Sequence, residues 1–236
     1  MEHIPGFVSQ ILAPSPKYHN SNYRAPELLE QLGSDGLPIL VARPRLRHLQ
    51  AHHLVRPCTQ LTVLQRAVEK ASDAGALIFA AASNWGNRGS VPFPARHSFR
   101  TMCMFSTNAD DQASSFNPEP RERENNFAIL GEDLEHPADP QRRESGTSMA
   151  TAIAAGLAAR IVDFSRQGDN ATIERVADVG SLAGMTAIFR FMSKRAGPFQ
   201  CVSPLRLMSE RYRSNAREKN RAYVRESLHR AMESAD

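Results

Sequence analysis

Three short segments in the middle of the chain carry continuous apolar runs instead of alternating with polar residues; in the second, only the two end residues, Thr101 and Ser106, are polar. They comprise residues 76–81, 101–106 and 127–130. Unbroken apolar runs of this length are typical of strands that are covered on both faces of a sheet. Residues 60–74 instead carry apolar positions at helical spacing and stop before Gly75, which predicts a helix with a glycine at its carboxyl end. The pattern indicates an α/β fold with a parallel sheet.

The segment after Ser145 predicts a helix with very small side chains. Seven of the ten residues from 150 to 159 are alanine or glycine, so this helix can lie close to a sheet, and we expect it to be the most buried helix. The polar residues 132–144, which include two prolines, predict an exposed loop. Further helices are expected at about 171–178, 181–194 and 206–232.

The first 60 residues differ in composition from the rest. They contain seven of the fifteen prolines, which interrupt long helices and central strands, so only residues 25–32 and 39–42 are expected to form short elements. We therefore divide the chain into an irregular, proline-rich region at 1–59, a domain at 60–197 and a helical, basic tail at 198–236.

Charge and composition argue against a nucleic-acid partner. The formal net charge is +4 and only 7% of the residues are aromatic, and the tail mixes positive and negative side chains as solvated helix faces do. We find no apolar run of about 18 residues and no secretory signal pattern, so we expect no membrane partner and favour an intracellular location. Three cysteines at unrelated spacings predict neither a disulfide framework nor a zinc site, and no cofactor or metal is expected; the oligomeric state cannot be predicted.

Two polar residues lie at the ends of predicted elements, where catalytic groups are often found. Ser148 lies at the start of the small-residue helix, where its hydroxyl meets the positive end of the helix dipole and its N–H is an unpaired donor. Asn84 follows the strand predicted at 76–81, and its amide could supply a second donor. The alternatives are that Ser148 or Thr147 caps the helix and that Asn84 is a turn residue.

The sequence around these residues resembles the subtilisin-like serine peptidases. Gly-Thr-Ser-Met-Ala at 146–150 is similar to the nucleophile motif of that family, and residues 80–87 are similar to the segment that bears its oxyanion-hole asparagine. The resemblance covers roughly residues 60–165. It implies part of a three-layer subtilisin-like fold and a peptide or protein substrate. It also implies site roles: Ser148 as nucleophile, Asn84 in the oxyanion hole, and Ala81, Ala82 and Ser83 lining the pocket for the substrate side chain before the scissile bond.

The other two members of the family's catalytic triad have no counterpart in the sequence. In this family the aspartate stands in an Asp-Ser/Thr-Gly turn and the histidine in a His-Gly-Thr/Ser run. None of the eight histidines here is followed by glycine, and neither Asp35 nor Asp73 has the required neighbours. His52 and His53 are best interpreted as exposed loop residues. The chain therefore corresponds to the carboxyl half of such a catalytic domain, and without a base its serine is not expected to cleave peptides unaided.

Two other functions compete with a peptidase. The first is a non-catalytic remnant that acts as a peptide-binding or interaction module. The second is a hydrolase with a Gly-x-Ser-x-Gly nucleophile elbow, which requires a glycine where Ala150 stands. The family's usual proline after the nucleophile motif is replaced by Thr151, which a first helical turn can accommodate.

Overall fold

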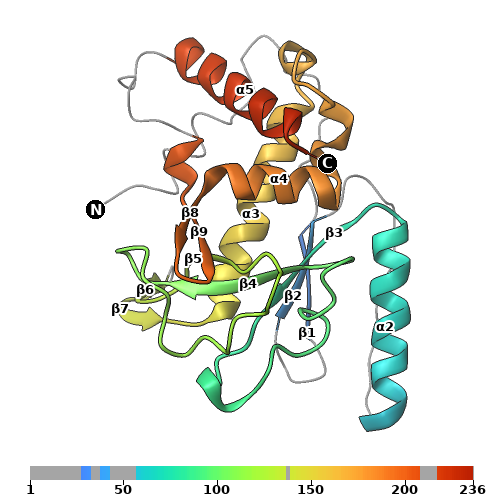
Figure 1. Cartoon of the computed structure of the whole chain (residues 1–236), viewed down its shortest axis with the longest axis vertical. Helices are drawn as coiled ribbons and strands as arrows, with labels where there is room; N and C mark the ends of the chain where they lie inside the picture. Colours follow the sequence, from blue (N-terminus) through green and yellow to red (C-terminus); the bar gives the residue numbers. More distant parts are fainter. Residues whose placement is uncertain (1–27, 33–37, 43–56, 137–138, 208–216, 236) are drawn as a thin grey trace.

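The computed structural model describes residues 28–32, 38–42, 57–136, 139–207 and 217–235 (Figure 1). A seven-stranded sheet with strand order β1-β2-β3-β4-β5-β9-β8 forms its centre. The strands are β1 (Leu28–Leu32), β2 (Pro38–Ala42), β3 (Leu77–Ala81), β4 (Met102–Thr107), β5 (Phe127–Leu130), β8 (Ser193–Ala196) and β9 (Phe199–Val202). β3, β4, β5 and β9 are parallel, and the remaining pairs are antiparallel. The fold is thus α/β with a parallel centre, as predicted, and with antiparallel pairings toward both edges of the sheet.

The three strands predicted from continuous apolar runs are present and buried. Every residue of β3 and β4 is buried, and so are three of the four residues of β5. Both faces of these strands are covered, which removes the polar alternation that a half-exposed strand would show.

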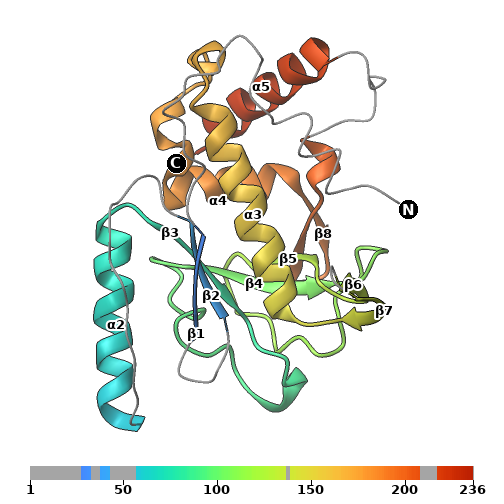
Figure 2. The same cartoon turned by 180° about the vertical axis from the view of Figure 1, so that it is seen from behind.

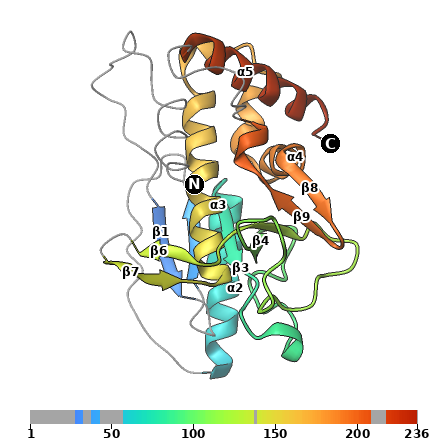
Figure 3. The ribbon, with the colours of Figure 1, turned by 90° about the vertical axis from the view of Figure 1, so that its left-hand side faces the viewer.

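Helices cover the two faces of the sheet. Phe79 packs in one cluster with α3 (Thr147–Ser165) and α4 (Leu182–Met192), whereas its neighbour Ile78 packs with Val68 of α2 (Pro57–Asp73). Because successive side chains of a strand point to opposite faces, α2 and α3 lie on opposite sides of β3. Figure 2 shows α3 crossing the sheet and α2 beside its edge, and Figure 3 shows the molecule from the side.

The small-residue helix is confirmed as α3. Thirteen of its nineteen residues are buried, among them alanines that let the helix approach β4 and β5. By length and composition α3 could also cross a membrane, but 67% of its apolar window is buried inside the fold. The helix therefore serves as a core element here, and the absence of a membrane partner stays a prediction.

The prediction of a loop at 132–144 is wrong, although most residues of the segment whose burial is described are exposed, as predicted. This segment contains β6 (Leu134–His136) and β7 (Asp139–Glu144), which pair as a separate antiparallel two-stranded sheet. No residue of β6 is buried, so the segment has no apolar face and its polar sequence concealed the strands.

The later part of the chain also departs from the predicted helices. Residues 171–178 do not form an α-helix; turns lead there into the 3₁₀ helix η4 (Val176–Gly180). Residues 182–192 form the predicted helix, α4, whose start is capped by the Ser181 hydroxyl. The β8–β9 hairpin was not predicted. Three short 3₁₀ helices complete the described residues: η2 (Gly86–Arg88), η3 (Gly168–Asn170) and η5 (Pro204–Arg206).

The amino-terminal strands cover one edge of the parallel strands. β2 pairs antiparallel with β3, and β1 pairs with β2, so β3 is not an edge strand. These two strands correspond to the short elements expected at 25–32 and 39–42. His52 and His53 lie outside the described residues, and the domain boundaries proposed at 59/60 and 197/198 stay predictions.

The carboxyl-terminal helix α5 (Arg217–Glu233) is part of the packed fold. Its side chains Val224, Leu228, Ala231 and Met232 are fully buried in the main core. Arg221 is also fully buried, an exception to the interpretation of the tail's charges as solvated helix faces; most other charged side chains of α5 are exposed, as predicted. Its guanidinium lies 4.8 Å from the centre of the Phe164 ring, at the end of α3.

The buried guanidinium of Arg221 is stabilised by hydrogen bonds to polar side chains. Its Nη2 donates to Gln167 Oε1 at 2.7 Å and to both carboxylate oxygens of Asp169, at 3.1 and 2.9 Å. Arg225 donates to the same carboxylate and to Asn170. The two arginines of α5 thereby fasten it to the segment that follows α3.

Asp169 gives this attachment a dependence on pH. Burial alone would raise the pKa of this carboxyl, but the hydrogen bond and charge of Arg221, together with Arg225, hold the pKa below its ordinary value. A lowered pKa stabilises the folded state above the pKa of the unfolded chain, near 3.9, and the contribution disappears as the pH falls further. We expect urea melts to show a free energy of unfolding that declines below about pH 4. In Asp169→Asn this part of the decline should be missing and stability at pH 7 reduced; an unchanged pH profile would contradict the assignment.

Candidate functional site

The candidate site lies where the carboxyl ends of the parallel strands meet the amino end of α3. Gly131, directly after β5, accepts a hydrogen bond from the Gly146 N–H at 2.8 Å, and its own N–H donates to Thr107 at the end of β4. The chain that leaves β3 brings Ser83 and Asn84 to the same place. The end of the sheet and the first turn of α3 are thus joined by backbone hydrogen bonds.

Asn84 contacts the first turn of α3 directly. Its Oδ1 accepts a hydrogen bond from the Thr147 N–H at 2.8 Å, and the Ser83 N–H donates to Thr147 Oγ1 at 3.3 Å. Because Ser148 follows Thr147, the structure brings the two residues singled out in the sequence together. The contact also fixes the orientation of the Asn84 amide, since the atom facing an N–H must be its oxygen.

The alternative that Ser148 or Thr147 caps α3 is wrong. The N-cap residue is Gly146, which has no side chain, and the Asn84 amide satisfies the Thr147 N–H from outside the helix. Among the residues that the structure describes, no hydrogen-bond partner is recorded for the Ser148 hydroxyl or for its N–H. The Ser148 side chain is partly exposed, so these groups remain open to a ligand.

The contact between Asn84 and the first turn of α3 requires a glycine at position 146. The φ of Gly146 is 156°, and a Cβ at this position would lie 3.1 Å from Asn84 Nδ2. A side chain here would be strained and would crowd the Asn84 amide. Ser148 and Asn84 were predicted as site residues from the sequence, whereas the roles of Gly146 and Thr147 were not, although both belong to the motif that carried the resemblance.

The three residues predicted to line a substrate pocket are buried. The exposed fractions of Ala81, Ala82 and Ser83 are 3%, 0% and 0%. They lie directly before Asn84, and Ser83 contacts Thr147, so they border the site. Their role in binding a substrate side chain stays a prediction.

Ser83 has a strained backbone and an unpaired hydroxyl. Its φ is 100°, a conformation that costs a non-glycine residue about 1–3 kcal/mol. Its buried Oγ has no hydrogen-bond partner within the described part of the chain. We expect Ser83→Gly to raise the free energy of unfolding by about 1 kcal/mol, after the entropic cost of glycine is subtracted.

Ser83→Ala separates the two contributions, because alanine removes the hydroxyl but retains the strained φ. Urea denaturation of both variants should therefore place Ser83→Ala between the natural chain and Ser83→Gly. A loss of stability in Ser83→Gly would show that the backbone conformation at residue 83 is not strained.

Buried hydrogen bonds support the strand ends behind the site. The Asn117 side chain bonds to both the N–H and the carbonyl of Ser106, at 2.9 and 2.8 Å, and the Ser106 hydroxyl pairs with that of Ser114. Ser106 pairs with Ile129 of β5 on one side, and these bonds satisfy its other side, beyond the point where the pairing with β3 ends.

Among the described residues, no base and no other nucleophile is hydrogen-bonded to Ser148. Cys103 is buried in β4, and burial raises the pKa of its thiol to about 12, which keeps it protonated and unreactive. No hydrogen bond joins Ser148 to any of the described histidines, at positions 97, 136 and 229. Within the described ranges, no three His, Cys, Asp or Glu side chains gather at a place that could hold a metal ion.

The chain is similar to known proteins in sequence and in fold. The sequence profile of the subtilase family matches residues 55–187, more than half of the chain. No curated protein is significantly similar to it. The solved structures that it resembles include a mutant of the protease domain of PatA, at 18% identity and a TM-score of 0.46, and the prenylagaramide maturation protease PagA, at 19% and 0.45. These matches cover 59% and 71% of this chain but only 50% and 55% of the other two, so the chain spans about half of their length.

Proposed function

Since this chain belongs to the subtilase family, a family of serine peptidases, we propose that Ser148 and Asn84 form the nucleophile and oxyanion-binding part of a serine endopeptidase site. The ligand is a segment of peptide or protein. The observation that carries the proposal is the 2.8 Å hydrogen bond from the Thr147 N–H to Asn84 Oδ1, which sets the amide beside the nucleophile motif.

The Asn84 amide is suited to bind a developing oxyanion. With its oxygen occupied by Thr147, its NH2 group is the part left for a ligand, and the Ser148 N–H at the amino end of α3 provides a second donor. Donors that are already oriented before the reaction stabilise a tetrahedral intermediate most effectively, and one such donor contributes about 10²–10³ in rate. The buried Ala81, Ala82 and Ser83 would form the adjacent wall of the substrate pocket.

Hydrolysis by this chain alone is not part of the proposal. A serine hydroxyl requires a neighbouring base, and the sequence contains neither the His-Gly nor the Asp-Ser/Thr-Gly motif of the family. An oxyanion site without its base retains a rate only about 10³–10⁴ times that of the reaction in water, the residual found for subtilisin without its triad. The second candidate function, a non-catalytic peptide-binding module, follows from the same geometry and differs only in that the site never turns over substrate.

Peptide hydrolysis and peptide binding test the two parts of the proposal separately. We expect the purified chain and Ser148→Ala to cleave a fluorogenic peptide mixture equally slowly, because the hydroxyl lacks a base. Cleavage that is much faster than that of Ser148→Ala would overturn the statement that this chain is inactive unaided.

For binding, N-acetylated tripeptides with a free carboxyl end place a carboxylate oxygen where the oxyanion would form. In NMR titrations we expect them to shift the Asn84 side-chain NH2 and the Ser148 N–H signals, and we expect Asn84→Ala to abolish the Ser148 shift. Arg230→Ala, an exposed residue of α5, is the control that should leave both shifts unchanged. If neither signal moves with any peptide, the assignment of an oxyanion-binding site is wrong.

A further inference from the structure

The loop that carries Asn84 is hydrogen-bonded to its neighbours at both ends. At its start, the Ala82 N–H donates to the Met104 carbonyl of β4 at 3.0 Å. Two residues after Asn84, the Gly86 N–H donates to the Phe116 carbonyl at 2.9 Å. Asn84 lies between these two bonds and is itself exposed. The position of its amide therefore depends on where the Phe116 carbonyl is held.

The side chain of Asn117 holds this carbonyl at the end of β4. Asn117 is only 6% exposed. Its Oδ1 accepts a hydrogen bond from the Ser106 N–H at 2.9 Å, and its Nδ2 donates to the Ser106 carbonyl at 2.8 Å. β3 pairs with β4 only as far as Met104, so the Asn117 amide supplies the donor and the acceptor that β3 no longer provides. Phe116 is thereby anchored to β4 through the residue that follows it.

We propose that Asn117 is a positioning residue for the Asn84 amide, an inference that rests on the oxyanion role proposed for Asn84. The bonds of Asn117 to β4 fix Phe116, whose carbonyl fixes Gly86. The loop between them then presents the Asn84 NH2 group in one orientation. Donors that are oriented before the reaction stabilise an oxyanion most effectively. Asn117 acts only through the loop, because its side chain is buried and is bonded to β4 through both of its polar atoms.

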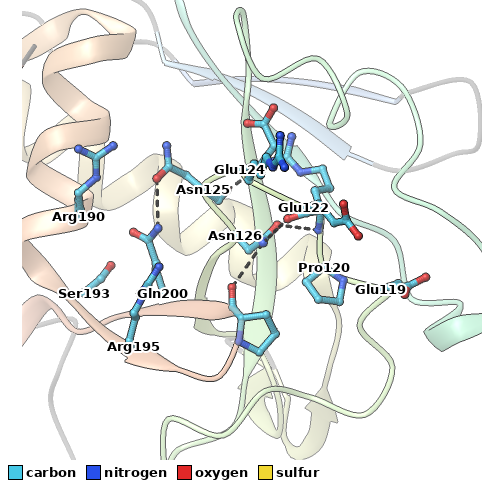
Figure 4. Close-up of a pocket in the computed structure, with 13 residues that line it drawn as sticks. Glu119, Pro120, Glu122, Glu124, Asn125, Asn126, Arg190, Ser193, Arg195 and Gln200 are labelled. Atoms are coloured by element: carbon cyan, nitrogen blue, oxygen red, sulfur yellow. Dashed lines mark hydrogen bonds between the residues drawn. The ribbon is translucent and has the colours of Figure 1, made fainter.

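Asn126 is a second buried asparagine of the same kind at the other end of the parallel strands. It is 3% exposed, and its side chain bonds to both the N–H and the carbonyl of Arg121, at 3.0 and 2.8 Å. It directly precedes β5 and borders a hollow of about 890 Å³ (Figure 4). Asn84 instead follows the carboxyl end of β3, and β3, β4 and β5 run parallel. Replacing Asn126 thus removes the same kind of hydrogen bonds without touching the loop of Asn84.

Asn117→Ala tests the proposal in the ligand-free protein. We expect amide hydrogen exchange at Gly86 to become about tenfold faster or more, because the loop has lost its anchor. We also expect the Asn84 side-chain NH2 signals to shift in NMR spectra. Asn126→Ala is the matched control and should leave both observations as in the natural chain. Unchanged Gly86 and Asn84 signals in Asn117→Ala, or equal changes in the two variants, would overturn the proposal.

The rate at which a fluorophosphonate labels Ser148 separates this proposal from the proposed function. Asn117→Ala should slow the labelling about tenfold and leave its pH dependence unchanged, since a donor is misplaced while proton transfer is not altered. Normal labelling of Asn117→Ala, together with slow labelling of Asn84→Ala, would show the positioning role alone to be wrong. Equal labelling of the natural chain and Asn84→Ala would instead overturn the oxyanion role on which this inference rests.

Should Asn117→Ala fail to fold, hydrogen exchange in the natural chain still tests the anchor. The Ser106 N–H is bonded to Asn117, and the Gly86 N–H is bonded to Phe116. Both amides should therefore be protected from exchange as long as Asn117 stays on β4. Protection at both supports the anchor, whereas a Gly86 amide that exchanges as fast as an unprotected one shows that the loop is not held there.

Discussion

Replacing Arg221 with alanine is expected to lower the free energy of unfolding by about 3 kcal/mol. The guanidinium is fully buried and bonds to Gln167 and to both oxygens of Asp169. Its removal leaves the Asp169 carboxylate with a weaker set of partners and opens a cavity against the Phe164 ring. The effect is measured by urea denaturation at pH 7, with far-UV circular dichroism to report α5.

Arg230→Ala provides the matched control on the same helix. Arg230 also pairs with a carboxylate, that of Glu226, at 2.9 Å, but both side chains are more than half exposed. Exposed pairs of this type contribute less than about 1 kcal/mol, so this variant should unfold close to the natural chain. Equal losses from Arg221→Ala and Arg230→Ala would mean that α5 is not fastened to the core through Arg221.

Gly131→Ala is expected to destabilise the protein by about 1–3 kcal/mol and to disturb the candidate site. A Cβ on this residue would lie 2.8 Å from the Ala150 Cβ, 2.8 Å from Ser106 Oγ and 2.9 Å from the Ala150 N. Two of these three atoms belong to the first turns of α3 and cannot rotate away. The helix would therefore have to move from the sheet, which would shift the Thr147–Asn84 contact.

Gly156→Ala tests the same substitution at an unconstrained position of α3. A Cβ there would meet nothing within 4 Å, and alanine favours a helix over glycine by about 0.5–1 kcal/mol. The two substitutions should thus have opposite signs in urea melts, and only Gly131→Ala should move the Asn84 side-chain NH2 signal. Equal effects on stability would contradict the close contact between the end of β5 and α3.

The parts of the fold that burial controls could be predicted from the sequence. β3, β4 and β5 are covered on both faces and are therefore continuous apolar runs, and α3 is built from small residues because it lies against the sheet. The β6–β7 hairpin and β8 were missed for the converse reason, because their residues are largely polar or partly exposed and backbone pairing leaves little trace in such a sequence. β9 is buried at three of its four positions, but a run of four residues that includes Gln200 is too short to predict a strand.

Arg221 shows a second limit of sequence reasoning. A single arginine in a helix of mixed charges resembles a surface residue, and its burial depends on partners more than 50 positions earlier in the chain. The site was easier to predict, because Ser148 and Asn84 are carried by local motifs at the ends of predicted elements. The roles of Gly146 and Thr147 depend on φ and on a hydrogen bond between distant segments, so they required coordinates.

The rate at which a fluorophosphonate modifies Ser148, followed by mass spectrometry from about pH 5 to pH 9, tests the central claim most directly. An oriented oxyanion site without a base predicts slow labelling that rises steadily with hydroxide concentration, is absent in Ser148→Ala and falls about 10²-fold or more in Asn84→Ala. Rapid, stoichiometric labelling at pH 7 with an inflection near pH 6.5, the ordinary pKa of histidine, would reveal an activating base and contradict the account.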